Sequence, residues 1–192
     1  MLLEEYVNGA ELQIRRIDRT RKSVANTLKN IDNINWNTYR SQHLRIFCDA
    51  HFYFICIGQV SKCFETLCGE LKNKKLNKIK SEFKNVFSQE IRNDLEHINE
   101  RAVGKKYGKS IGRITDFKNF TNENLTFNGK SYPVDKTSLN KLKKIYKSIM
   151  SVIHEEYALK DPSFVNRMNR EKQLKKTIRF AEKEYQIYLH SK

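Results

Sequence analysis

The residues with the clearest chemical potential lie in the segment Arg92-Asn93-Asp94-Leu95-Glu96-His97. The guanidinium group of Arg92 can bind a phosphate, and the imidazole of His97 can accept or donate a proton near neutral pH. These two groups are what metal-independent cleavage of RNA requires. A base removes the proton of a 2′-hydroxyl group, the hydroxyl attacks the adjacent phosphate, and a cation stabilises the charge that develops. Arg92 and His97 are therefore the candidate catalytic pair.

The positions of these residues on a helix permit this chemistry without requiring it. Arg92 and His97 would lie about 140° apart around a helix, at the two edges of an apolar stripe. Asn93, His97 and Arg101 would follow one line along the helix, and Glu96 is one turn from Arg92. We treat Asn93, Glu96 and Arg101 as supporting polar residues. A structural interpretation, in which Arg92 pairs with Glu96 and His97 is half-buried, stays open, as does the choice between an acid and a base role for His97.

The positive charge of the chain points to a polyanionic partner. Its 192 residues include 37 Lys and Arg against 22 Asp and Glu, a net charge of +15, for which nucleic acid is the first candidate. The surplus lies in four segments with a net charge of +5 each, namely residues 15–29, 72–84, 101–118 and 162–192. The second and third of these flank the candidate pair and would attract a phosphate backbone to it, although solvated helix faces also explain such charge. Four residues of the third segment are candidate RNA-binding residues: Lys105, Lys106, Lys109 and Arg113.

Hydrophobic periodicity predicts two long helices in the first part of the chain. Apolar residues spaced by three and four positions predict a helix over residues 3–28, with Arg21 as the one interruption. A second helix would be capped by Asn37 or Thr38 and end near Leu71. Because it is apolar almost all round in its middle, it should be the central helix.

The next part of the chain would carry the candidate pair and an insertion. Apolar spacing predicts a third helix from about Leu76 to Ala102. Residues 105–136 are richer in Gly and Asn than the predicted helices around them. They are predicted to form a loop with a small hairpin inserted into the helical domain. The hairpin signal is Asn128-Gly129 between two short segments that favour strands.

Two further helices complete the predicted fold. Thr137 or Ser138 would cap the fourth, and Asp161-Pro162 would start a fifth over about residues 162–190. The chain is thus predicted to be a single all-α domain over residues 1–192, a bundle of about five helices with a β-hairpin insertion.

Composition excludes several other classes of protein. The most apolar run, Ile46 to Ile57, spans about 12 residues, fewer than the roughly 20 that a transmembrane helix needs. It is therefore a predicted core helix, and Arg45 and His51, a looser Arg and His pair, are assigned to the core with it. The four cysteines occupy one helical segment, which argues against a disulfide framework or a zinc site and for buried thiols. We expect a cytoplasmic protein with no metal, no cofactor and no membrane partner.

The segment from Ile91 to Ala102, IRNDLEHINERA, resembles the signature of the HEPN superfamily. That signature is an Arg, four to six residues and a His, with a polar residue, often Asn, directly after the Arg. The resemblance implies a helical bundle that dimerises, so that two motifs face each other across a cleft that cuts RNA without metal. It implies that Arg92 and His97 are the catalytic pair and that Asn93 is the adjacent polar residue. Some toxin members have a Tyr two positions after the His, where this chain has Asn99.

The resemblance also implies a biological setting and an alternative. Members of the superfamily act as toxins, often beside a nucleotidyltransferase antitoxin, and in antiviral defence. We therefore expect a homodimeric, metal-independent endoribonuclease with RNA as substrate and an antitoxin or another defence protein as partner. The alternative is a helical RNA- or protein-binding module without activity, such as an adaptor or inactive subunit of a defence complex.

Overall fold

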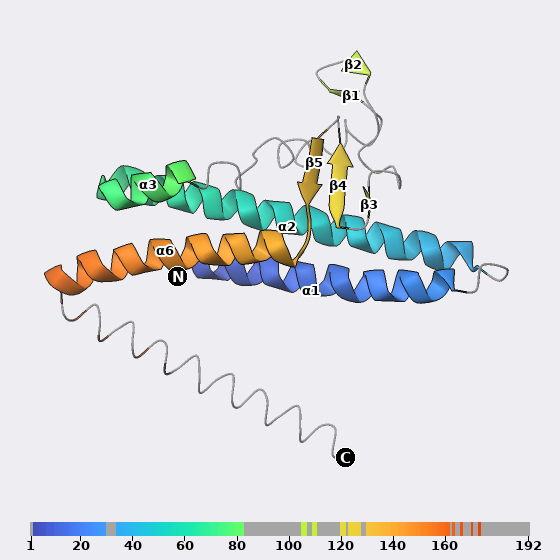
Figure 1. Cartoon of the computed structure of the whole chain (residues 1–192), viewed down its shortest axis with the longest axis horizontal. Coiled ribbons are helices and arrows are strands. Elements are labelled where there is room, and N and C mark those ends of the chain that lie inside the picture. Colours follow the sequence, from blue (N-terminus) through green and yellow to red (C-terminus); the bar gives the residue numbers. More distant parts are fainter. Residues whose placement is uncertain are drawn as a thin grey trace, which may run out of the picture. The chain divides into compact units, whose positions relative to one another are not determined.

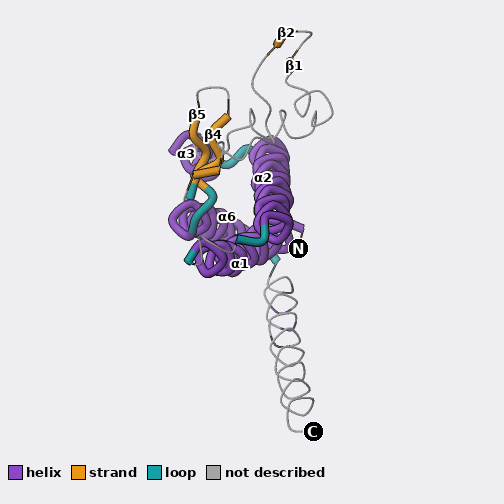
Figure 2. The backbone as a smooth tube through the Cα atoms, turned by 90° about the vertical axis from the view of Figure 1, so that its right-hand side faces the viewer, coloured by secondary structure: helices purple, strands orange, loops and turns teal. Residues whose placement is uncertain are grey.

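A computed structural model describes residues 2–29, 34–82, 105–106, 109–110, 120–121, 123–127 and 130–161, together with the single positions 163, 166, 170 and 173. The chain divides into two compact units, Met1–Lys147 and Ser148–Lys192, and each is described by itself. The described residues form four helices and short antiparallel strands (Figures 1 and 2). This confirms a mainly helical fold with a small β insertion.

The first helix, α1 (Leu2–Leu28), follows the predicted apolar stripe for most of its length. Its buried apolar residues are Leu3, Val7, Ala10, Ile14 and Ile17. Leu28, also predicted to face inward, is instead 39% exposed. The predicted interruption has a structural role, because the guanidinium of half-buried Arg21 donates a hydrogen bond of 3.0 Å to the carbonyl of Val134. A polar side chain in the stripe therefore ties α1 to the end of the sheet.

The second helix, α2 (Trp36–Leu71), is the longest of the described helices. It packs along α1 and also contacts α3 (Lys74–Glu82). The predicted cap at Asn37 or Thr38 is wrong, because the side chain of Asn35 accepts the hydrogen bond from the backbone N–H of Thr38. Asn35 meets the geometric need of a cap, since it precedes the first helical residue and lies three positions before the donor. The helix ends at Leu71 and is capped by Lys72, which has a left-handed φ of 46° and donates its backbone N–H to the carbonyl of Cys68.

An ion pair links the middles of α1 and α2. The Nε atom of Arg16 lies 2.9 Å from Oδ1 of Asp49, whose side chain is only 2% exposed. Oδ2 of Asp49 is buried with no hydrogen-bond partner. Burial therefore raises the pKa of Asp49 above its ordinary value, although Arg16 and Arg45 act to lower it. The pair specifies the register of the two helices at the cost of a partly unsatisfied carboxylate.

Contacts on either side of this pair extend the helix–helix interface. Towards the start of α1, a Cβ atom added to Gly9 would lie 3.0 Å from the Sγ atom of Cys56, so the two helix backbones approach closely there. Towards its end, the Nε2 atom of Gln42 donates hydrogen bonds to the hydroxyl groups of Ser23, at 2.9 Å, and Thr27, at 3.2 Å. A small residue, an ion pair and an amide network thus hold α2 antiparallel to α1.

The helix α3 begins after Asn73, whose side chain accepts hydrogen bonds from the backbone N–H groups of Lys75 and Leu76. Leu76 and Ile79 are buried, as the predicted apolar face requires. The predicted continuation of this helix to Ala102 lies outside the described residues.

The predicted insertion contains five short strands. Strands β1 (Lys105–Lys106) and β2 (Lys109–Ser110) pair with each other, and β3 (Phe120–Thr121), β4 (Asn124–Phe127) and β5 (Lys130–Pro133) form a three-stranded antiparallel sheet. Phe127 and Lys130 are register partners on either side of Asn128-Gly129, which confirms that these two residues separate paired strands. The strands β4 and β5 lie to one side of the helices (Figures 1 and 2).

The last described helix, α6 (Lys136–Lys160), begins directly after the sheet. Its first turn is capped by Asp135, whose Oδ1 accepts a 2.6 Å hydrogen bond from the backbone N–H of Ser138. The predicted cap at Thr137 or Ser138 is therefore wrong by two or three positions, and Ser138 is the return partner of a capping box. Lys143 and Lys136 bind Glu11 and Asp18 of α1, at 2.8 and 3.3 Å.

The fifth predicted helix has one confirmed local signal within the described residues. The Oδ1 atom of Asp161 accepts hydrogen bonds from both the backbone N–H and the hydroxyl group of Ser163, as an N-terminal cap does. The extent of a fifth helix over residues 162–190 stays a prediction.

Two expectations about the apolar segment of α2 need correction. Cys48 is exposed and only Cys68 is buried, although all four cysteines are free thiols. Arg45 is exposed rather than part of the core, because a charged side chain stays in water unless it is paired and the nearby Asp49 is bonded to Arg16. None of the helices in the described part of the chain has an apolar stretch long enough to cross a membrane.

Replacing Arg16 should show how strongly the buried carboxylate of Asp49 destabilises the folded protein when it has no counter-ion. Arg16→Gln leaves Asp49 charged and without its counter-ion, so we expect a loss of about 3 kcal/mol in the free energy of unfolding at pH 7. Because the pKa of Asp49 is raised in the folded protein, this loss should shrink as the pH falls through the raised pKa towards the ordinary value of 3.8. Urea unfolding between pH 7 and pH 4 measures both effects.

The matched control is Arg15→Gln, which removes an exposed arginine that binds Glu11 one turn away. It should cost less than about 1 kcal/mol at either pH. Equal losses for the two variants would contradict a special role for the Arg16–Asp49 pair.

Two glycines of the long helices, Gly9 and Gly69, should respond to substitution in opposite directions. Gly69→Ala meets no atom within 4 Å, so it should stabilise the protein by about 0.5–1 kcal/mol through helix propensity alone. Gly9→Leu places a bulky side chain against Cys56 and should destabilise it by about 1–3 kcal/mol. Thermal unfolding of both variants tests the close approach, which a neutral Gly9→Leu would contradict.

Candidate functional site

The predicted catalytic residues lie outside the part of the chain that the structure describes. This holds for Arg92 and His97, and equally for the supporting residues Asn93, Glu96 and Arg101. Their roles therefore stay predictions that rest on the sequence.

Three of the four predicted RNA-binding residues belong to one strand pair. Lys106 and Lys109 are register partners across the pair of β1 and β2, and Lys105 is partnered with Ser110. The backbone thus brings three lysines together within two short strands, whereas Arg113 lies outside the described residues.

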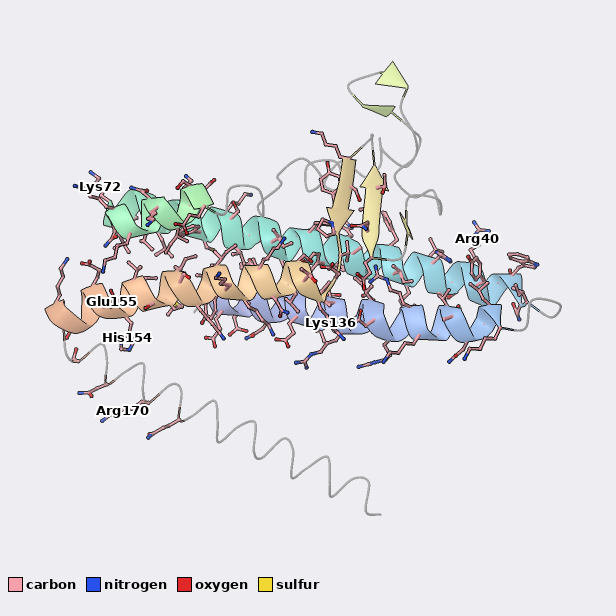
Figure 3. The ribbon with its side chains drawn as sticks, viewed as in Figure 1. Arg40, Lys72, Lys136, His154, Glu155 and Arg170 are labelled. Atoms are coloured by element: carbon pink, nitrogen blue, oxygen red, sulfur yellow. The ribbon has the colours of Figure 1, made fainter. Side chains whose placement is uncertain are left out.

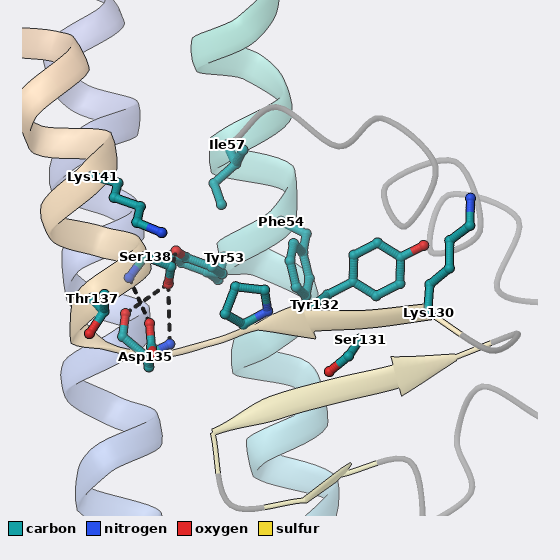
Figure 4. Close-up of a pocket in the computed structure, with 11 residues that line it drawn as sticks. Tyr53, Phe54, Ile57, Lys130, Ser131, Tyr132, Asp135, Thr137, Ser138 and Lys141 are labelled. Atoms are coloured by element: carbon teal, nitrogen blue, oxygen red, sulfur yellow. Dashed lines mark hydrogen bonds between the residues drawn. The ribbon is translucent and has the colours of Figure 1, made fainter. Parts of the chain in front are cut away.

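The described residues of the first unit enclose a cavity of about 560 Å³ between α2, β5 and the start of α6 (Figure 4). Tyr53, Phe54 and Ile57 of α2 form one wall, and the strand contributes Tyr132 and Pro133. Phe54 and Tyr132 pack edge to face, with ring centroids 6.1 Å apart. The walls are therefore largely apolar and aromatic.

The polar end of this cavity is a hydrogen-bond network built on the first turn of α6. The hydroxyl of Ser138 donates to the carbonyl of Asp135 at 2.8 Å and lies 3.3 Å from the backbone N–H of Asp135, which donates to it. The hydroxyl of Tyr53 lies 2.8 Å from the same oxygen. Ser138 is thus fully engaged in capping the helix and in binding Tyr53, which argues against a role as nucleophile.

Burial sets the protonation state of Tyr53. Its side chain is fully buried, and desolvation raises its pKa to about 12, although the hydrogen bond with Ser138 acts to lower it. The phenol is therefore neutral at physiological pH and cannot serve as a general base there. Its role is to tie α2 to the start of α6.

Two lysines complete the cavity. Lys141 projects from α6 beside Ser138, and Lys130 lies at the other end of β5, beyond Tyr132 (Figure 4). Aromatic walls between two ammonium groups suit a ligand with a flat apolar body and a negative charge. Because the hydroxyl groups of Tyr53 and Ser138 are committed to structure, the chemistry of this cavity favours ligand binding over catalysis by these two groups.

Metal binding has no support in the described part of the chain, where no group of three or more His, Cys, Asp or Glu side chains could hold an ion. Sequence reasoning also missed the contact between Tyr53 and Ser138. The spacing of Asp135 and Ser138, three residues apart before an apolar run, is the signal that predicts the capping box. Nothing in the sequence signals the partner on α2.

Comparisons of the chain with protein-family models, with curated proteins and with solved structures found no match.

The network around Ser138 can be tested by a double-mutant cycle. Ser138→Ala removes the return bond of the capping box and leaves the buried hydroxyl of Tyr53 unpaired, so it should cost about 1–3 kcal/mol of unfolding free energy. Tyr53→Phe leaves the cap intact and should cost about 1 kcal/mol. The double variant should lose less than the sum of the two, because the unpaired phenol is gone.

Ser151→Ala is the control for this cycle, since Ser151 is an exposed residue of the same helix whose hydroxyl binds Glu155. It should change stability by less than about 0.5 kcal/mol. Additive effects of Ser138→Ala and Tyr53→Phe would show that the two hydroxyl groups are not coupled.

Proposed function

We propose that the protein is a HEPN-like, metal-independent endoribonuclease that acts as a homodimer, as a toxin or an effector of antiviral defence. The observation that carries the proposal is Arg92-Asn93, three residues and His97 within a basic and mainly helical chain. The phosphate-binding Arg92 and the proton-transferring His97 are the two groups that the reaction needs. A nucleotidyltransferase-type antitoxin or another defence protein is the proposed partner.

The reaction would use the RNA as its own nucleophile. His97 of one subunit would accept the proton of a 2′-hydroxyl group, the 2′-oxygen would form a bond to the adjacent phosphorus, and the bond from phosphorus to the 5′-oxygen would break. An acid returns a proton to that leaving oxygen, a role open to the second His97 of a dimer. Arg92 would stabilise the charge on the phosphate oxygens. The products are a 2′,3′-cyclic phosphate and a 5′-hydroxyl end.

The distribution of charge supports RNA as the substrate. The net charge is +15, and the strands that follow the motif in the chain carry Lys105, Lys106 and Lys109. Electrostatic attraction of a phosphate backbone by such a segment requires no particular base sequence.

A second function, in a protein-binding module without activity, is favoured by an apolar line on α2. Leu44, Cys48 and Phe52 are each one turn apart and all exposed, Leu44 by 48% and Phe52 by 54%. Apolar side chains in such a line are typical of a helix face that packs against another protein.

Cleavage in the presence of EDTA distinguishes the two functions. Wild-type protein should cleave single-stranded RNA into products with 2′,3′-cyclic phosphate ends, and RNA with 2′-O-methyl groups should resist, because the nucleophile is blocked. His97→Ala and Arg92→Ala should each lower the rate at least about 100-fold, the usual contribution of an acid–base or an oxyanion-stabilising group.

His154→Ala is the control, because His154 is a half-exposed histidine of α6 outside the motif. Its rate should equal that of the wild type. Equal cleavage by wild type and His97→Ala, or cleavage of the 2′-O-methyl substrate, would contradict the proposal. Absence of cleavage together with stable co-purification of a protein partner would support the binding module instead.

A further inference from the structure

A second cavity, of about 570 Å³, lies between the last turns of α1 and the first turns of α2. It belongs entirely to the first unit, at the end of the helix pair remote from Gly9 and Cys56. Its volume falls within the roughly 300–1,000 Å³ typical of ligand sites. The size is sufficient for a phosphate group together with parts of the molecule that carries it.

The lining of this cavity is polar and positively charged. Arg19 of α1 and Arg45 of α2 contribute the charge, and the other lining side chains are hydroxyl or amide groups. Among the described residues no carboxylate, imidazole or thiol lines it, so the lining lacks the ligands that a bound metal cation would need. The chemistry of the lining therefore selects an anion.

The charges of the two arginines are available to a ligand. Both residues are exposed, and no ion pair joins either of them to a carboxylate among the described residues. The neighbouring acids are already paired, since Asp18 binds Lys136 at 3.3 Å and Asp49 binds Arg16 at 2.9 Å. Asp49 is near enough to sense the charge of Arg45 but remains bonded to Arg16.

The floor of the cavity is held in place before any ligand binds. Gln42 is 9% exposed and its amide nitrogen is shared between Ser23 and Thr27, so the two helices are cross-linked beneath the arginines. Asn35 is fixed by its cap to Thr38. Because these side chains are already ordered, binding would cost little further conformational entropy.

Phosphate is the anion that fits this arrangement best. A guanidinium group presents a planar fork of N–H donors that matches two phosphate oxygens, and two such groups face one cavity here. The hydroxyl of Ser41 and the amide of Asn37 add neutral donors. The first turn of α2 lies at the same place and adds the positive end of its dipole, although the arginines carry the argument.

We propose that this cavity, formed by Arg19 and Arg45, binds the phosphate groups of a single-stranded nucleic-acid backbone. The site is separate in the sequence from the proposed catalytic pair, so it would anchor the strand whether or not Arg92 and His97 cleave it. A free nucleotide or inorganic phosphate offers the same chemistry, and the experiment separates these sources.

Binding is measured with the His97→Ala protein, in which cleavage cannot complicate the result. Fluorescence anisotropy with a labelled 20-nucleotide single-stranded RNA gives the affinity over a range of salt concentrations. The test variant adds Arg19→Gln and Arg45→Gln. We expect about a tenfold weaker affinity and a decrease of about 0.7–1.4 in the slope of log K against log salt, because one or two phosphates are then no longer neutralised.

The matched control adds Arg15→Gln and Arg40→Gln to the same background. It removes the same charge from the same two helices at exposed positions outside the cavity, and Arg40 points away from α1 (Figure 3). Circular dichroism checks that both proteins fold. A weaker affinity confined to the test variant supports the site, whereas equal weakening in both variants would show only general attraction and overturn it.

Inorganic phosphate and AMP, titrated by calorimetry, form the second arm. Binding that requires Arg19 and Arg45, combined with unchanged RNA affinity in the test variant, would support the phosphate site and assign it to a small phosphate ester. If neither RNA binding nor binding of phosphate and AMP is weakened by the loss of the two arginines, the proposed site is overturned. Both measurements are independent of whether the protein cleaves RNA.

Discussion

The close antiparallel packing of α1 against α2 positions the other elements of the first unit. Three features of different physical kinds occur along this interface. They are the close approach at Gly9, the buried ion pair of Arg16 and Asp49, and the hydrogen bonds of the Gln42 amide. Each has a different physical basis, and only the first is apolar packing. A buried ion pair adds little net stability, but it disfavours any register in which Asp49 would lack its counter-ion.

Some charged residues of α1 and α2 form ion pairs that hold the helices together, and others face a cavity at the surface. On α1, Glu11, Asp18 and Arg16 are used in bonds to α6 and α2, so several charged residues near the middle of the interface are structural. Arg19 and Arg45, one or two turns away, are left facing a polar cavity. The positive charge of residues 15–29 therefore has two different uses within a few turns of helix.

The two cavities complement each other chemically. The one beside β5 has aromatic walls and a hydroxyl network occupied in capping α6, whereas the one between α1 and α2 is lined by hydroxyl, amide and guanidinium groups. Neither offers an acid and a base poised for catalysis. The proposed catalytic function rests on the pair at residues 92 and 97, and the described helices contribute the two cavities.

Local sequence patterns were enough to predict much of the described helical structure, because periodic apolar spacing and turn residues act within a few positions. They predicted α1, the end of α2 at Leu71, the buried face of α3 and the strands beside Asn128-Gly129. The caps of α2 and α6 were predicted wrongly, since several adjacent polar residues can cap a helix and geometry selects one. The catalytic pair, a proposal from its residue types and spacing, rests on the sequence alone.

Only the tertiary structure could pair Tyr53 with Ser138 or bring Arg19 beside Arg45, because these partners are far apart in the chain and meet only when helices pack. The same holds for Arg45 itself, which the apolar character of its neighbours assigned to the core. Its exposure was decided by which face of α2 meets α1, and that choice depends on the buried contacts of Asp49 and Gln42. Sequence spacing determines which residues share a helix face, whereas packing determines which face is covered.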